Sequence, residues 1–227
     1  MKLLEIDAKT LYAARRWRVE IFTDAAPMLS QDRWPSACLA DLADVGSESL
    51  NPSEFPESFV YLGLENVESV SGDPVDVRIR RRSEIKSRSK KYVAGDVLYG
   101  RLRPYLRKVF LATAGGLCST EFVVLKPKPV ILPEVLRALL ASEQIGTRIA
   151  HQQIGAALPR VSMKDLMHVS LPLIPIAEQR IFAEKIAALT RSRQVLKAEL
   201  ASMPKRFEDT VQEFVSAPNQ PQHQASA

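Results

Sequence analysis

Positive charge is concentrated in one stretch of this 227-residue chain, from Arg78 to Lys108. The stretch holds twelve Lys or Arg and two acidic residues, whereas the whole chain carries a net charge of only +5. Arginine suits phosphate oxygens and the guanine edge because its planar guanidinium donates two parallel hydrogen bonds, and lysine supplies a point charge. Tyrosines between the arginines add surfaces on which bases stack. The stretch therefore predicts nucleic-acid binding, against the more general explanation of a solvated charged face.

The candidate contact residues lie mainly on two loops, 78–91 and 99–108. We expect Arg101 and Arg103 to read bases, and Lys90 and Lys91 to contact phosphates. The full candidate set is Arg78, Arg80, Arg81, Arg82, Lys86, Arg88, Lys90, Lys91, Tyr99, Arg101, Arg103, Tyr105, Arg107 and Lys108, with Gln152, Gln153 and Arg160 as additions.

A nuclease-like pattern lies in the same stretch. Residues 74–76 followed by 84–86 loosely resemble the acidic and ExK elements of restriction-type nucleases, in which carboxylates and a lysine on paired strands hold Mg²⁺. A charged loop explains the pattern more simply, because the ExK triplet stands in a polar run with no predicted strand on either side. A cryptic nuclease built on Asp76, Glu84 and Lys86 stays open as a third hypothesis.

Other catalytic and metal-binding patterns are missing from the sequence. The three histidines are scattered, and His151 and His168 fit a surface residue and a satisfied helix-end residue. Cys38 and Cys118 form no CxxC pair, so we expect neither a zinc site nor a disulfide, and a reducing compartment. No glycine-rich phosphate motif and no serine nucleophile elbow occurs. We therefore predict no catalytic residue and no metal in this chain.

The composition is that of an ordinary globular protein, with 46% apolar and 25% charged residues. The first residues are interrupted by Glu5, Asp7 and Lys9, so no signal-peptide core forms there. No apolar run approaches the roughly 20 residues of a membrane span. The sequence thus predicts a cytoplasmic protein.

The elements that must position the basic loops predict an α+β domain. Apolar and basic residues alternate over 75–80, which indicates a half-buried strand with one basic face. Since strands come first and helices later, this class fits better than a doubly wound sheet. Further elements are expected at 59–64, 97–99, 109–112 and 122–125 as strands, and at 134–149 as a helix that follows Pro133.

A joint between two kinds of sequence lies at residues 155–200. Ser162 as the N-cap and Asp165 in the first turn predict a short helix over 164–167. The apolar run 169–176 holds two prolines, which suit an edge strand or an extended connector.

After the joint, one long helix carries a coiled-coil stripe. A helix over 177–203 would extend about 40 Å, which is longer than a small domain can cover, so a core helix is the weaker alternative. An uncovered stripe needs a partner helix. Pro204 should kink or restart the helix. The seam positions are Phe182, Ile186, Leu189, Arg193, Leu196, Leu200 and Met203, of which Arg193 stands where an apolar residue is expected.

Four segments resemble the specificity subunits of Type I restriction-modification systems: YLGLENVES (61–69), YVAGDVLYGRLRPYLRKVFLA (92–112), STEFVVLKPK (119–128) and LPRVSMKDLMHVSLPLIPIAEQRIFAEKIAAL (158–189). In that family a target recognition domain ends with a short helix and a P-x-x-EQ segment that leads into a long helix. Pro175, Glu178 and Gln179 stand at those places here.

The resemblance implies an α/β-type target recognition domain that contacts double-stranded DNA through loops, with catalysis in other subunits. Family members usually have two such domains and two antiparallel helices, whereas this chain has one of each, so it resembles a half-size subunit. The resemblance further implies a recognition domain at 31–175 and a dimerisation helix at 176–216. A loosely amphipathic pattern over 4–22 predicts an N-terminal helical segment at 1–30, and a composition rich in Pro, Gln and Ser predicts a disordered tail at 217–227.

The resemblance also implies partners. We expect a homodimer, or pairing with a second half-subunit, that recruits an adenine methyltransferase and, where the system has one, a restriction subunit. S-adenosylmethionine, and ATP with Mg²⁺, are then expected in those partner subunits and no cofactor in this chain.

A rival hypothesis is a coiled-coil interaction protein whose basic face binds RNA or an acidic protein.

Overall fold

The computed structural model describes residues 33–151 and 158–216, which fall into two units. The first unit ends at Ala183, and the second begins at Glu184 and continues the last helix. The predictions for residues 1–30, for the tail at 217–227 and for Gln152 and Gln153 lie outside the described residues.

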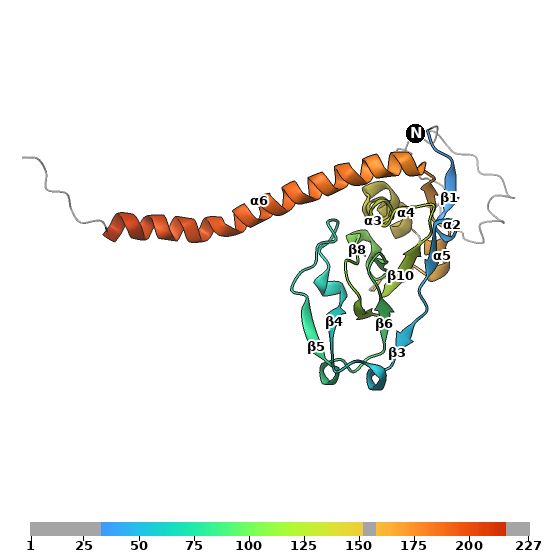
Figure 1. Cartoon of the computed structure of the whole chain (residues 1–227), viewed down its shortest axis with the longest axis horizontal. Coiled ribbons are helices and arrows are strands. Elements are labelled where there is room, and N and C mark those ends of the chain that lie inside the picture. Colours follow the sequence, from blue (N-terminus) through green and yellow to red (C-terminus); the bar gives the residue numbers. More distant parts are fainter. Residues whose placement is uncertain (1–32, 152–157, 217–227) are drawn as a thin grey trace, which may run out of the picture. The chain divides into compact units, whose positions relative to one another are not determined.

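The first unit contains all the described strands, the short helices α2 to α5 and the first residues of α6 (Figure 1). The strands are β1 (Ser36–Cys38), β2 (Ala43–Val45), β3 (Ser49–Leu50), β4 (Ser58–Leu62), β5 (Arg78–Arg81), β6 (Ser89–Tyr92), β7 (Val97–Gly100), β8 (Val109–Leu111), β9 (Gly116–Ser119), β10 (Phe122–Pro127) and β11 (Ser170–Pro172). The α-helices are α2 (Leu39–Leu42), α3 (Pro133–Ala141), α4 (Glu143–His151), α5 (Met163–Met167) and the long α6 (Ile176–Ser216). Short 3₁₀ turns are η2 (Pro52–Glu54), η3 (Leu64–Asn66), η4 (Arg82–Glu84) and η5 (Pro104–Leu106).

A four-stranded antiparallel sheet, in the order β2-β10-β7-β8, forms the middle layer of this unit. Side chains of a strand alternate between the two faces of its sheet. Tyr99 and Val123 point to one face, where they pack with the apolar sides of α3 and α4. Leu98, Phe122 and Val124 point to the other face. Both faces are therefore buried, and apolar residues fill successive positions in these strands.

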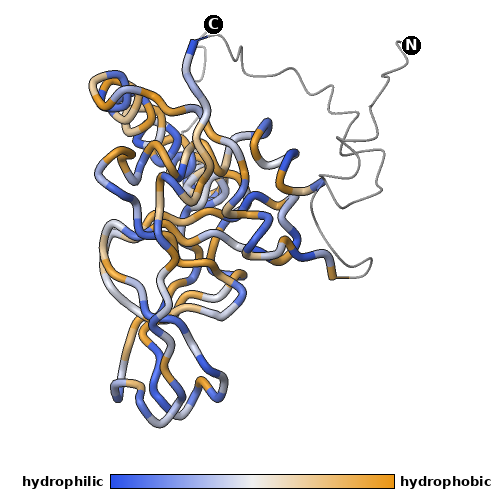
Figure 2. Tube along the Cα trace, turned by 90° about the vertical axis from the view of Figure 1, so that its right-hand side faces the viewer, coloured by the Kyte–Doolittle hydropathy of each residue, from blue (hydrophilic) through white to orange (hydrophobic). Residues whose placement is uncertain are grey.

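A five-stranded sheet, in the order β3-β6-β9-β4-β5, covers the second face of the middle layer. Leu62 of β4 and Cys118 of β9 face the middle sheet, and Phe59 and Leu117 face a smaller apolar cluster on the outer side. Figure 1 shows the layers in sequence from α3 and α4, through β8 and β10, to β4, β5 and β6. Figure 2 shows apolar stretches of the tube crossing the centre of this unit, as expected for buried strands.

The predicted half-buried strand at 75–80 is only partly correct. A strand forms at Arg78–Arg81, but it is the outermost strand of its sheet, and Ile79 is 72% exposed. The alternation of apolar and basic residues is therefore present without burial of the strand's apolar side. The sequence analysis also missed β6, which lies inside the basic stretch and pairs with β9.

The single helix predicted at 134–149 is two helices. Ser142 separates them with an extended backbone, φ −62° and ψ 149°. Its hydroxyl donates to the carbonyl of Leu139 at 2.7 Å and lies 3.4 Å from the amide of Ile145, which donates to it. A serine that bonds both helix ends competes with the helical pattern, so the chain turns there.

The predicted elements of the joint are confirmed. The Ser162 hydroxyl accepts from the Asp165 amide at 3.0 Å and caps α5. At the C-terminal end of α5, His168 places Nδ1 2.7 Å from the Lys164 carbonyl oxygen, as expected for a satisfied helix-end residue. The following β11 pairs antiparallel with β1, so the two ends of the domain meet in one small sheet.

The start of α6 is held in the first unit by Gln179, which is buried. Its Oε1 accepts from the Leu132 amide at 2.7 Å. Its Nε2 donates to the carbonyls of Val130 and Ile174 at 2.8 and 2.7 Å. The Gln179 amide therefore satisfies three backbone groups from two segments, because a side-chain amide offers both an acceptor oxygen and two donor hydrogens.

Gln179→Ala should lower the free energy of unfolding by about 3 kcal/mol, because it removes a buried side chain and leaves three partly buried backbone groups without their hydrogen-bond partner. Urea denaturation of the two proteins measures the difference. The neighbouring exposed Arg180→Ala is the matched control and should change the free energy by under about 0.5 kcal/mol. Equal effects of the two substitutions would contradict the role of Gln179.

From Glu184 onward α6 forms the second unit, and its apolar side chains are exposed. Leu189, Leu196, Leu200 and Met203 of the predicted seam are between 54% and 71% exposed. The helix is continuous through Pro204, so it does not restart there, although the proline removes one helical hydrogen bond. Among the described residues, no helix is long and apolar enough to cross a membrane.

Candidate nucleic-acid interface

The predicted contact residues of the first loop surround β5 and η4 at the edge of the five-stranded sheet. Two of the arginines form ion pairs with nearby acids, Arg78 with Asp76 at 2.7 Å and Arg80 with Glu84 at 3.2 Å. Hydrogen bonds from the Arg81 amide and from Arg80 lower the pKa of Glu84. The side chains of Arg81, Arg82, Lys86 and Arg88 are exposed and have no ion pair within the described part of the chain.

The second loop, between β7 and β8, is fixed at its base. The Lys108 ammonium donates to the Leu64 carbonyl at 2.7 Å. Arg107 packs on α4 at Gly146, where an added Cβ would lie 2.4 Å from the Arg107 Cδ. A larger residue at this position would force the Arg107 side chain to shift. Arg107 and Lys108 therefore hold the loop.

The tip of the second loop is exposed. Arg103 and Arg107 flank η5 with left-handed backbones, φ 50° and 49°, and between them Tyr105 is 52% exposed. The Arg103 amide donates to the Pro159 carbonyl at 2.7 Å, so a distant segment fixes the backbone while its side chain faces solvent. Arg103 and Tyr105 thus combine a fixed backbone with an available guanidinium and ring.

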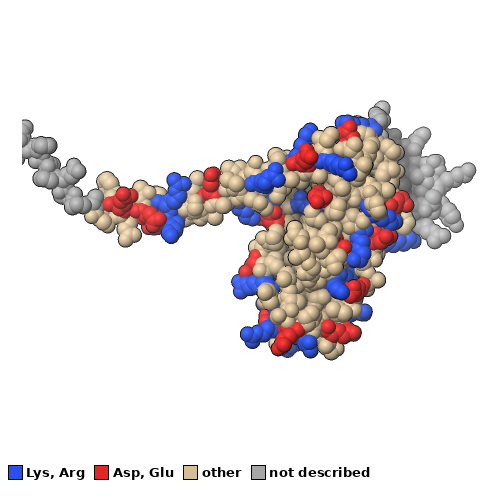
Figure 3. All heavy atoms as spheres, in the orientation of Figure 1, with Lys and Arg blue, Asp and Glu red and all other residues tan. Residues whose placement is uncertain are grey.

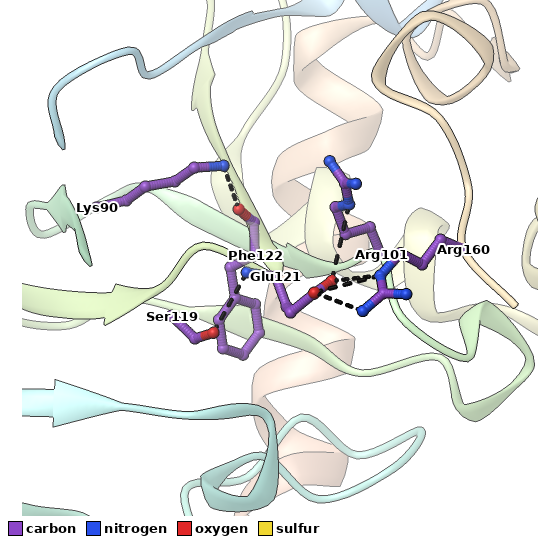
Figure 4. A network of polar contacts seen from close by, with 6 residues as sticks. All are labelled: Lys90, Arg101, Ser119, Glu121, Phe122 and Arg160. Carbon is purple, nitrogen blue, oxygen red and sulfur yellow. Dashed lines mark hydrogen bonds and ion pairs between the residues drawn. The ribbon is translucent and has the colours of Figure 1, made fainter. Parts of the chain in front are cut away.

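Three charged residues from different parts of the chain meet beside this loop, namely Arg101, Glu121 and Arg160 (Figure 4), here called the arginine–glutamate cluster. Arg160 donates Nη2 to Oε1 of Glu121 at 2.8 Å and Nε to Oε2 at 3.1 Å. Arg101 places Nε 3.8 Å from Oε2, which is an ion pair without a hydrogen bond. This Nε is buried and has no hydrogen-bond partner among the described residues.

Backbone hydrogen bonds align the segments of this cluster. The Arg101 amide donates to the Glu121 carbonyl at 3.0 Å, and the Val161 amide donates to the Arg101 carbonyl at 3.1 Å. Leu102 and Arg160 form an isolated antiparallel bridge. The sheet therefore sets the positions of the three side chains.

Electrostatics within the cluster follow from these contacts. The hydrogen bonds from Arg160 lower the pKa of Glu121, with smaller contributions from the charges of Arg101 and Lys90. The same hydrogen bonds raise the pKa of Arg160. Burial lowers the pKa of Lys90, whose ammonium donates to the Phe122 carbonyl at 2.6 Å. Glu121 therefore stays ionised in an environment of three cations.

Several predicted contact residues have structural roles instead. Tyr99 is only 1% exposed and packs in the core under α3 and α4, so its ring is not available to bases, and burial raises its pKa. Lys90 is half-buried and bonded to Phe122, and Lys91 pairs with Glu48 at 2.9 Å. Lys90 and Lys91 lie on β6, a strand that the sequence analysis missed. Tyr99 lies on β7, a strand that the sequence predicted without showing that Tyr99 is buried there.

The sequence analysis missed Glu121 and Gly146. Glu121 lies in the STEFVVLKPK segment, and an acid between basic segments was the available signal, but its partners lie 20 and 39 positions away in the chain. Gly146 stands inside a helix, where glycine is unfavourable by about 1 kcal/mol relative to alanine. That helix-interior position is a signal for close packing.

The residues of the nuclease hypothesis do not come together as a metal site. Asp76 pairs with Arg78 and Glu84 pairs with Arg80, so each carboxylate has its own cation. In the described ranges, no three His, Cys, Asp or Glu side chains form a group that could hold a metal ion. Both cysteines have free thiols, and burial raises the pKa of Cys118 to about 12.

Acidic residues are interspersed with the basic ones on the visible face. Figure 3 shows lysine and arginine next to aspartate and glutamate over the sheet end of the first unit. On the side in view, the basic side chains therefore do not form an uninterrupted positive patch.

Comparisons with known proteins agree on one family. The chain is 21% identical to the Type I restriction enzyme EcoDI specificity subunit of Escherichia coli over 185 residues. It superposes with a TM-score of 0.61 and 28% identity on the HsdS subunit from Thermoanaerobacter tengcongensis, over 83% of this chain and 52% of that one. The chain resembles Type I specificity subunits in sequence and in fold. The resemblance predicted from the sequence is confirmed.

Two further solved structures share the same fold. A chain from a structure on complex assembly and conformational transition of the type I R-M system gives a TM-score of 0.62 at 26% identity, over 86% of this chain and 51% of that one. The S subunit from M. genitalium shares the fold at a TM-score of 0.51 and 16% identity, over 78% of this chain and 44% of that one. No protein-family model matches the chain.

The chain spans about half the length of the specificity subunits it matches. The matched part is 82% of this chain but 41% of the E. coli specificity subunit. This coverage agrees with a single target recognition domain, as expected from the sequence.

Protonation of Glu121 should weaken the first unit at acidic pH. The folded pKa of Glu121 lies below its ordinary value of 4.5, so its contribution to stability is present above about pH 4.5 and is lost as the pH falls through the folded pKa. Relative to the wild type, Glu121→Gln should be destabilised at about pH 7, and the difference should shrink towards about pH 3. Urea denaturation at several pH values measures this, and in an Arg160→Gln background the pH-dependent difference should be much smaller.

Proposed function

We propose that this chain acts as a non-catalytic specificity subunit of a Type I restriction-modification system, in which it supplies one target recognition domain that reads a DNA sequence and leaves catalysis to partner subunits. The observation that carries the proposal is the match of 82% of the chain to less than half of an E. coli specificity subunit. The exposed basic side chains of the two loops, of which the second has a fixed backbone, support it. Since its proposed target is DNA, we place it in the cytoplasm.

The proposed DNA contacts are the exposed side chains of the two loops. Arg103, with its backbone bonded to Pro159, is suited to read a base edge, because a fixed backbone limits the positions of its guanidinium. Tyr105 offers an exposed ring beside it. Arg81, Arg82, Lys86 and Arg88 are suited to phosphates, since they are exposed and available at the sheet edge.

The proposed partner of α6 is a second half-subunit. The exposed apolar seam at Leu189, Leu196 and Leu200 requires a partner helix to remove it from water. Two chains would supply two recognition domains and two helices, which produces a bipartite site. We propose that the dimer recruits an adenine methyltransferase, which would bring S-adenosylmethionine, and a restriction subunit with ATP and Mg²⁺ where the system has one.

DNA binding should weaken steeply with salt, with a log–log slope of about −5 for roughly six phosphate contacts. Arg103→Ala should lose about 1 to 3 kcal/mol of discrimination at one base position, whereas Lys86→Ala should weaken binding to all sequences alike. Methylome sequencing of a host with and without the chain identifies the recognised site, and binding titrations on that site measure both variants. A flat salt dependence would count against DNA binding, and equal losses on specific and random DNA would refute base reading by Arg103.

Charge on the seam should abolish the dimer. Leu189→Lys combined with Leu196→Lys places two ammonium groups in the apolar interface, so we expect a monomer by sedimentation equilibrium. The control is Ala187→Lys combined with Gln194→Lys. It adds two lysines at the same spacing but outside the seam, so this variant should stay dimeric. An unchanged mass of the leucine variant would place the interface elsewhere.

A further inference from the structure

The arginine–glutamate cluster holds an acid where a DNA-binding surface gains from cations. Glu121 faces the guanidinium groups of Arg101 and Arg160, and Lys90 lies close enough for its charge to act on the carboxylate. The backbone of Glu121 is fixed on both sides, because the Glu121 amide donates to the Ser119 hydroxyl and the Glu121 carbonyl accepts from the Arg101 amide. Glu121 is therefore held in position by the turn between β9 and β10 as well as by its charge.

The Glu121 carboxylate occupies the donors of Arg160 that suit a phosphate. Two nitrogens of Arg160 donate to the two carboxylate oxygens, which is the forked arrangement that arginine also forms with phosphate oxygens. A phosphate and this carboxylate cannot accept from the same two donors at once. DNA must therefore displace Glu121 before Arg160 can contact its backbone through this edge.

Arg101 is held less tightly than Arg160. Its Nε lies 3.8 Å from Glu121 and forms no hydrogen bond within the described residues. The carboxylate nevertheless reduces the positive potential at Arg101, because opposite charges at this distance compensate each other. All three side chains are partly exposed, with 28% to 38% of their surfaces accessible, so solvent and DNA reach the cluster.

We propose that Glu121 is a specificity-determining residue that lowers the affinity for DNA of unrelated sequence by occupying Arg160 and screening Arg101; this inference rests on the proposed DNA-binding function. Unrelated DNA offers mainly phosphates, which meet a neutralised pair and a repelling carboxylate. DNA that also forms base contacts gains enough to displace the carboxylate. Glu121 thus increases the ratio of specific to non-specific affinity at some loss of total affinity.

The test measures binding of the full chain to a random-sequence 30-base-pair duplex at several salt concentrations. Glu121→Gln should bind about threefold to tenfold more tightly than the wild type and give a salt slope steeper by about 1, since one more cation becomes available to phosphate. Glu48→Gln is the matched control, because it removes an acid that pairs with Lys91 and changes the net charge equally. The control should stay within about twofold of the wild type.

A double-substitution cycle separates the action of Glu121 through Arg160 from a general effect of charge. In the Arg160→Gln background, the gain from Glu121→Gln should shrink to less than half. Unfolding in urea shows whether each variant is folded. If Glu121→Gln is not folded, Glu121→Asp replaces it in the test. The shorter aspartate cannot reach both donor nitrogens of Arg160, so it should give a smaller gain in DNA affinity of the same sign.

The outcomes distinguish this inference from the function on which it rests. A gain for Glu121→Gln that exceeds the control and depends on Arg160 supports the inference. An unchanged or weaker affinity, or an equal gain in the control, overturns it while wild-type DNA binding stands. If neither the wild type nor any variant binds DNA, both the inference and the proposed function fail.

Discussion

Burial of β10 on both faces is the constraint on which the rest of the first unit depends. Residues 122–125 are all at most 1% exposed and contact helices on one side and the second sheet on the other. The strand therefore cannot shift its register by one residue without exchanging two complete sets of core contacts. Because Glu121 directly precedes this strand, the carboxylate that meets both arginines is fixed by apolar packing.

The local features of this fold could be predicted from sequence. The cap at Ser162, the strands at 97–99 and 122–125 and the long helix follow from side-chain patterns within a few residues. The break at Ser142 could not, because one serine had to outcompete a continuous helical pattern by bonding both helix ends. Nor could β6, since a basic segment reads as a loop until a neighbouring strand pairs with it.

The candidate interface was harder to predict than the fold, because charge in a sequence does not show which charges are already paired. Arg160 and Glu121 are 39 positions apart and become partners only through the sheet. Half of the basic stretch is engaged in similar ways, with Lys108 bonded to Leu64 and Lys90 to Phe122. The surface available to a polyanion is therefore defined by the basic side chains that stay exposed, and not by the total charge.

The loop between β7 and β8 also affects how the protein can change over evolutionary time. Its base is tied down by Arg107 and Lys108, whereas Arg103 and Tyr105 at the tip contact little of the core. Substitutions of such exposed side chains usually shift folding stability by less than about 0.5 kcal/mol. The left-handed backbone at Arg103 restricts the choice mainly to residues without a branched Cβ. A lineage can therefore sample new tip residues one at a time, without first acquiring compensating changes in the domain that presents them.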